Sequence, residues 1–180
     1  MNKRRASTLW VAIAVVGVYL GSAGATWANN RWGCWKYQNA SINVYNGASQ
    51  AWYRHYQKKI WSHSRAWDPY TDLVLTQVSS PGKTDHINCY ADFYGNNGWL
   101  GIAEILTYSG CIIKEGRTRC NKTYLNNGGY SKKNKRHVAC QEVGHLFGLD
   151  HQYANTCMND SILTKPRPNA HDRNMVNGIY

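Results

Sequence analysis

The eleven residues from Gln141 to His151, QEVGHLFGLDH, constrain this chain more than any other stretch of it. Positions 141 and 145 are one helical turn apart, so their side chains lie on one face of a helix. We predict that this helix begins near Lys135, runs to Phe147 and ends at Gly148, because glycine adopts the left-handed conformation of a helix end most easily. The turn at Gly148 can then return His151 to the same helix face.

Three side chains of this stretch are suited to metal chemistry: Glu142, His145 and His151. Zinc favours imidazole nitrogen, and a site with three protein ligands leaves one position open for water. Glu142 is rotated away from positions 141 and 145 but is near enough to take a proton from that water. We therefore predict that His145 and His151 are zinc ligands and that Glu142 is a general base.

The pattern resembles the metzincin metallopeptidases, whose signature is H-E-x-x-H-x-x-G-x-x-H, and its G-H-x-x-G-L-D-H part is closest to the matrixin branch. Met158, in the run CMND, lies where metzincins place a methionine-bearing turn beneath the metal. Asp172 and the terminal Ile179-Tyr180 fit the last matrixin helix. The resemblance implies a secreted endopeptidase with one catalytic zinc ion and an extracellular protein or peptide substrate. The loops that carry structural zinc and calcium in matrixins are not recognisable, so neither calcium nor a second zinc ion is predicted.

An edge strand is also implied by the resemblance. The segment from Gly98 to Ile105 is similar to the strand along which the family lays its substrate. Gly101, Ile102 and Ala103 would then bind an extended peptide through main-chain hydrogen bonds.

Gln141 departs from the family pattern, because metzincins have histidine at this first ligand position. The carbonyl oxygen of glutamine is a poorer zinc donor than imidazole. Three interpretations stay open. Gln141 coordinates weakly and the enzyme is active, two histidines hold the metal with another group filling in, or the site is inactive and the fold serves binding. His137 cannot replace it, since it is more than two turns from His145.

The order of secondary structure predicts an α+β fold: a metzincin-like (zincin) domain, with a mixed twisted sheet, a long N-terminal helix, the active-site helix and a C-terminal helix. The long helix is expected over residues 49–67, with an aromatic stripe as its core face. That stripe comprises Trp52, Tyr56, Ile60, His63 and Trp67. The expected strands are Ser41–Tyr45, Leu73–Val78, Ile87–Tyr94 and Trp99–Leu106.

The N-terminus has the features of a secretory signal peptide. Lys3, Arg4 and Arg5 precede an apolar run and the small residues of 21–25. Cleavage after Ala25 or Ala28 would leave residues 29–180 as one secreted domain. The alternative is an uncleaved segment that anchors the chain in the membrane.

Six cysteines in an exported chain of this size predict three disulfides. Six cysteines allow 15 pairings, which the sequence alone does not resolve. The simplest pairing joins Cys111 to Cys120 across a short basic loop, and Cys34 to Cys89 by elimination. A bond between Cys140 and Cys157 would tie the active-site helix to the methionine turn.

The mature chain is basic, with a net charge of about +8 once the three leader cations are removed from the full +11. Such a surface can attract anionic polymers or acidic substrates, whereas no nucleic-acid-binding signature accompanies the charge. The run from Lys132 to Arg136 is expected to be a solvated loop. A competing hypothesis is a monomeric, non-catalytic module that holds a wall polymer or carbohydrate on a basic, Trp- and Tyr-rich surface.

Overall fold

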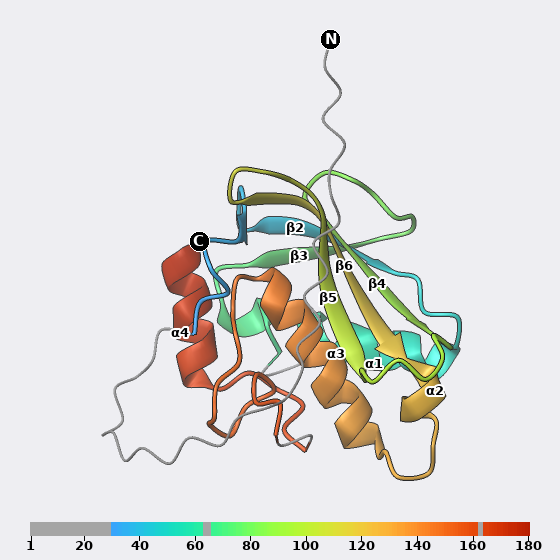
Figure 1. Cartoon of the computed structure of the whole chain (residues 1–180). Helices are drawn as coiled ribbons and strands as arrows, with labels where there is room; N and C mark the ends of the chain where they lie inside the picture. Colours follow the sequence, from blue (N-terminus) through green and yellow to red (C-terminus); the bar gives the residue numbers. More distant parts are fainter. Residues whose placement is uncertain (1–29, 63–65, 162–163) are drawn as a thin grey trace.

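The computed structural model describes residues 30–62, 66–161 and 164–180 (Figure 1). The predicted leader, with its cleavage sites after Ala25 and Ala28, lies outside these residues, as does His63. Within the described residues, no helix combines the length and the apolar character needed to cross a membrane.

A six-stranded mixed sheet forms one layer of the molecule. Its strands are β1 (Lys36–Tyr37), β2 (Ser41–Asn46), β3 (Val74–Val78), β4 (His86–Asp92), β5 (Gly101–Ser109) and β6 (Ile112–Asn121). The order is β1-β6-β4-β2-β3, all parallel, and β5 pairs antiparallel with β6. Among the described strands β5 has β6 as its single partner, so the other edge of β5 is open.

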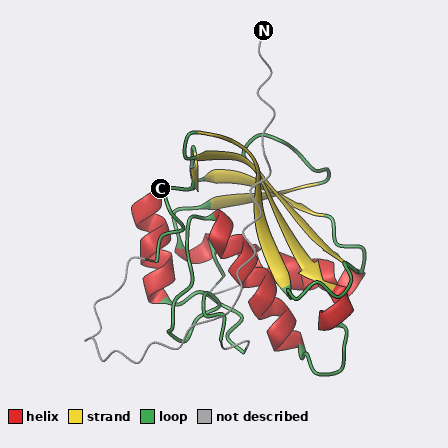
Figure 2. Cartoon of the chain, viewed as in Figure 1, coloured by secondary structure: helices red, strands yellow, loops and turns green. Residues whose placement is uncertain are grey.

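The second layer consists of helices. They are α1 (Ala51–Ser62), α2 (Lys122–Leu125), α3 (Lys132–Leu146) and α4 (Ala170–Ile179), with a short 3-10 turn at Asp68–Tyr70. α3 contacts β5 and β6, and α1 contacts α3. Figures 1 and 2 show α1 and α3 packed against the sheet and α4 beside the C-terminal end of α3. The α+β architecture predicted from the sequence is confirmed.

The core lies between these two layers because the strands alternate. Ile42 and Val44 of β2, with Ile87 and Ala91 of β4, are buried on the helix side. The largest fully buried side chains are Trp61, Trp67, Tyr37, Tyr53 and Phe147. Burial of this much apolar and aromatic surface is the main favourable term in folding.

Helix boundaries and faces differ from the sequence prediction. α1 ends at Ser62, so the predicted helix over residues 49–67 is too long. Of the predicted core stripe, Ile60 and Trp67 are buried as expected, whereas Trp52 and Tyr56 are only half-buried. Aromatic side chains at a helix flank produce the same periodicity as those at its core face, and α3 alongside α1 accepts them there.

The segment after Cys111 is also corrected. Residues 112–121, interpreted as a basic loop, form β6, the longest strand. Nine residues of extended chain separate Cys111 from Cys120 by about 30 Å, which excludes a bond between them.

The disulfides are Cys34–Cys111 and Cys140–Cys157, the latter being the pairing predicted from the sequence. Cys89 and Cys120 are buried free thiols, so the predicted Cys34–Cys89 and Cys111–Cys120 pairs are wrong. Both thiols face the core from neighbouring parallel strands, where Cys89 is paired with Thr118 and Cys120 with Ala91.

Candidate metal centre

Helix α3 carries the candidate site, and capping interactions define where it begins. The Ser131 hydroxyl accepts a hydrogen bond from the Asn134 amide, and the Asn134 side chain accepts one from the Ser131 amide. This capping box satisfies amides that would otherwise lack partners, so α3 starts at Lys132, three residues before the predicted position. Every residue from His137 to Leu146 is buried.

At its other end α3 is closed by Gly148, as the sequence predicted. Gly148 has φ +93°, and a Cβ there would lie 2.5 Å from the Trp35 carbonyl oxygen. The amide of Gly148 donates to the His145 carbonyl and that of Leu149 to the Gly144 carbonyl. This is a Schellman motif, which reverses the chain and brings the carbonyl of Leu149 back over the helix.

His145 and His151 meet at their Nε2 atoms, which are 3.1 Å apart. His145 Nδ1 lies 2.8 Å from the Leu149 carbonyl oxygen, which can only accept, so Nδ1 carries the proton and Nε2 of the neutral ring carries a lone pair. Burial, and secondarily His151, lowers the pKa of His145 to about 4, which keeps that ring neutral. Two imidazole ligands of one tetrahedral zinc ion have their nitrogens about 3.3 Å apart, close to the separation seen.

Asp160 stands behind His151, with its Oδ2 atom 3.7 Å from Nδ1 of that ring. At this distance the carboxylate is an ion-pair neighbour of the ring and not a hydrogen-bond acceptor for it. In the sequence, Asp160 stood out only as the last residue of the CMND run. The signal available was its place, two residues after the methionine.

Glu142 is 6% exposed and lies against the first residue of β5. A Cβ on Gly101 would sit 2.7 Å from Glu142 Oε1 and 2.5 Å from a Val138 methyl group. Glycine at position 101 therefore lets the edge strand approach the carboxylate. Burial raises the pKa of Glu142 to about 8.

Gln141 is 7% exposed, and its Nε2 atom is buried without a hydrogen-bond partner. An unpaired buried amide nitrogen costs about 1–3 kcal/mol, so the position is not optimised for stability alone. The described residues contain no cluster of three His, Cys, Asp or Glu side chains suited to a metal. The two imidazole Nε2 atoms are the candidate donor atoms that the structure brings together here, and Gln141 lies one helical turn before His145.

Met158 forms the floor beneath α3. It is fully buried, and a Cβ on Gly144 would lie 2.4 Å from its sulfur and 2.9 Å from the Trp67 ring. The Cys140–Cys157 bond ties this turn to the helix. Asp172 of α4 holds the turn from the other side, where its carboxylate accepts hydrogen bonds from Gln152 Nε2 and Thr156 Oγ1. Burial raises the pKa of this carboxyl group, and these hydrogen bonds oppose the rise.

The N-terminal segment contributes a part of the site that the sequence analysis missed. Arg31 bridges to Leu149, and the Asp150 amide donates to the Asn30 carbonyl. The Trp32 ring lies 5.5 Å from the His145 ring. This segment covers the chain reversal between the two histidines, and no local motif signals the contact.

The predicted substrate strand lies at the open edge of the sheet. Gly101, Ile102 and Ala103 pair with Cys120, Arg119 and Thr118 of β6. One residue on, Glu104 is clamped by Arg117 and Arg119, each making two hydrogen bonds of 2.8–3.0 Å to its carboxylate. These paired contacts fix β5 against β6 and leave its outer edge exposed to a partner strand.

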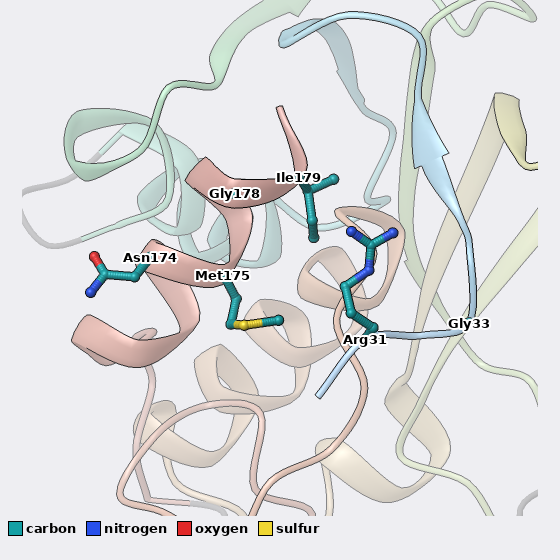
Figure 3. Close-up of a pocket in the computed structure, with 6 residues that line it drawn as sticks. All are labelled: Arg31, Gly33, Asn174, Met175, Gly178 and Ile179. Atoms are coloured by element: carbon teal, nitrogen blue, oxygen red, sulfur yellow. The ribbon is translucent and has the colours of Figure 1, made fainter. Parts of the chain in front are cut away.

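A separate hollow of about 470 Å³ lies between the N-terminal segment and α4 (Figure 3). Its lining comprises Arg31, Gly33, Asn174, Met175, Gly178 and Ile179. None of the predicted site residues is among them, so this hollow is not part of the candidate centre.

Comparison with known proteins identifies the fold. No family model and no curated protein matches the chain. Among solved structures, myroilysin matches with a TM-score of 0.55 at 13% identity, over 83% of this chain and 97% of that chain. Archaemetzincin from Archaeoglobus fulgidus, complexed with malonate, matches with a TM-score of 0.45 at 12% identity, over 75% of this chain and 99% of that chain. The myroilysin match shows a metzincin-like fold, as predicted, whereas the matrixin branch stays a prediction.

Proposed function

We propose that this chain is a secreted, zinc-dependent endopeptidase. The observation that carries the proposal is the convergence of His145 and His151 Nε2 atoms at 3.1 Å beside the buried Glu142. The two Nε2 atoms lie at hydrogen-bonding distance, so a zinc ion bound there would take the place of a shared proton and accept a lone pair from each ring. The metzincin-like fold and the two disulfides support the proposal, because disulfides persist in oxidising, extracellular compartments.

His145, His151 and, more weakly, the Gln141 amide oxygen would hold the metal. A zinc ion there would supply an acidified water as nucleophile and polarise the peptide carbonyl. The Leu149 carbonyl orients the His145 ring through the hydrogen bond at Nδ1, and the Asp160 carboxylate lies 3.7 Å from Nδ1 of His151. Met158 and the Cys140–Cys157 bond hold the loop that follows His151 beneath the helix.

The substrate would bind as an additional strand on β5. Its main chain would pair with the open edge at Gly101, Ile102 and Ala103, next to Glu142. Glu142 then takes the proton of the attacking water and passes it to the departing amine nitrogen. Because Gly101 lies against Glu142, a peptide paired with β5 at Gly101 would have its main chain near the Glu142 carboxylate.

The test combines metal content with cleavage, on the exported, disulfide-intact chain. After dialysis against trace zinc, elemental mass spectrometry should find close to one zinc per chain, and a quenched fluorescent peptide library should be cleaved. The Glu142→Gln variant should keep its zinc and lose cleavage by about 10²–10⁴-fold. Glu115→Gln, the same change in β6 away from the centre, is the matched control and should cleave normally.

Two results would contradict the proposal. Zinc content near zero in the intact protein would mean that two histidines and an amide do not hold the ion. Cleavage retained in Glu142→Gln would remove Glu142 from the mechanism.

A further inference from the structure

Helix α1 and the first half of α3 form a basic surface away from the candidate centre. We define the basic helix face as Lys59, Trp52 and Tyr56 of α1 with Lys132, Lys135 and Arg136 of α3. The two helices are in contact, and the Lys135 ammonium lies 4.4 Å from the centroid of the Trp52 ring and 6.0 Å from that of Tyr53. Figure 1 shows α1 alongside α3.

The cations of this face lack carboxylate partners. α1 contains no acidic residue, and the single acidic residue of α3 is Glu142, buried against β5. Among the described residues, no Asp or Glu side chain forms a salt bridge with Lys59, Lys132 or Arg136. The described part of the chain therefore supplies no carboxylate ion pair that would neutralise Lys59, Lys132 or Arg136.

The placement of these cations also opposes helix stability. Lys132 and Lys133 occupy the first two positions of α3, where no acidic residue is found. The helix dipole is positive at this end, so each cation there destabilises the helix by about 0.3–1 kcal/mol. An acidic residue in the same place would stabilise the helix by a similar amount. Residues that destabilise their own helix without a compensating structural contact are expected at functional sites.

We propose that the basic helix face binds a linear anionic polysaccharide. Sulfate or carboxylate groups would lie against Lys132, Arg136 and Lys59, and the sugar rings would pack on the half-buried Trp52 and Tyr56. This site does not depend on the proposed peptidase chemistry. The candidate metal ligands lie on the second half of α3 and in the turn that follows it.

Two other anionic partners fit this face less well. An anionic membrane is bound by apolar side chains that insert beside the cations, and the exposed large apolar residues all lie elsewhere. They are Tyr70, Val74, Phe93, Tyr108 and Tyr153. Nucleic acid is met rarely in the oxidising compartments where disulfides such as Cys34–Cys111 persist.

The experiment is titration calorimetry of the disulfide-intact chain with a size-defined heparin oligosaccharide and with an oligoglucuronate, over a series of salt concentrations. The test variant is Lys132→Glu/Arg136→Glu. The matched control is Lys83→Glu/Lys114→Glu, which changes the net charge equally in the loop before β4 and in β6. Binding of either polysaccharide should weaken about tenfold or more in the test variant and less than about twofold in the control, and its salt dependence should become shallower.

Loss of folding cannot imitate the expected result. Lys132→Glu places a negative charge at the positive end of α3, so the melting temperature of the test variant should stay level or rise. Equal weakening in both variants would overturn the proposal, because binding would then follow overall charge. Absence of binding to both polysaccharides, or tighter binding to poly(dT) or to phosphatidylserine vesicles, would overturn it as well.

Discussion

In the proposed metal centre, the residue at position 141 is expected to set how strongly zinc is held. The Gln141 amide is buried, its nitrogen has no hydrogen-bond partner, and it is one helical turn from His145. An amide oxygen is a weaker zinc donor than imidazole, so the centre is expected to bind zinc less tightly than a three-histidine site. Weak binding would make the activity of the proposed secreted peptidase sensitive to the concentration of zinc around it.

Replacing this residue tests its orientation. In Gln141→His, an imidazole would substitute for the amide, and zinc affinity should rise about tenfold or more, which is at least about 1.4 kcal/mol. Competition with a chromogenic chelator measures the change. Gln77→His, on the exposed strand β3, controls for an added histidine and should leave the affinity unchanged. An unaltered affinity in Gln141→His would mean that position 141 does not face the ion.

Helix α3 is the element on which the site is built, and both of its ends are held by local interactions. Its N-terminus is closed by the Ser131–Asn134 capping box and its C-terminus by the Schellman motif at Gly148. The cap at Ser131 also offsets the cost of the lysines that follow it at the positive end of the helix dipole.

Removing the cap should therefore destabilise the chain measurably. Ser131→Ala should lower the free energy of unfolding by about 1 kcal/mol, because the Asn134 amide loses the hydroxyl oxygen that accepts its hydrogen bond. Urea denaturation provides the measurement, with Ser80→Ala, an exposed loop serine, as the matched control. Zinc content should not change, because the candidate ligands lie at the other end of the helix. A stability equal to that of the unmodified chain would show that the capping box contributes nothing.

At the scale of the whole molecule, two disulfides hold segments that carry no regular structure. Cys34–Cys111 attaches the N-terminal segment, which includes Trp32 beside His145, to the β5–β6 hairpin across 77 residues. Cys140–Cys157 attaches the Met158 turn to α3. The candidate site thus has covalent links on both sides.

The Cys34→Ala/Cys111→Ala variant should lose about 2–5 kcal/mol of stability, since a long loop of the unfolded chain is no longer closed. The cysteine assignment can be checked directly by alkylation without reductant. Two thiols, Cys89 and Cys120, should react after unfolding and neither before it, because both are buried and burial raises the pKa of Cys89 to about 12. If no thiol reacts even after unfolding, Cys89 and Cys120 form the third disulfide that the cysteine count predicted.

The local parts of this protein were predictable from the sequence. The Gln141–His151 stretch, the helix end at Gly148 and strands such as Ser41–Tyr45 depend on spacing and on residues a few positions apart. The same stretch supported the metzincin resemblance, and the myroilysin match confirms the fold it implied. The capping box was the local signal left unused: Asn134 was included in the loop expected over Lys132 to Arg136, and Ser131 directly precedes that loop.

The pairing of distant segments was decided only in the tertiary structure. The residues between Cys111 and Cys120 were expected to form a short basic loop closed by those cysteines. Instead residues 112–121 form β6, with β4 as a parallel partner and β5 as an antiparallel one. The Cys34–Cys111 bond forms because β1 pairs with the start of β6. The Trp32–His145 contact forms because Arg31 makes a β-bridge to Leu149. Such contacts join residues that are many positions apart in the sequence. Their free energy depends on which strands are neighbours in the sheet, and no short stretch of sequence determines that.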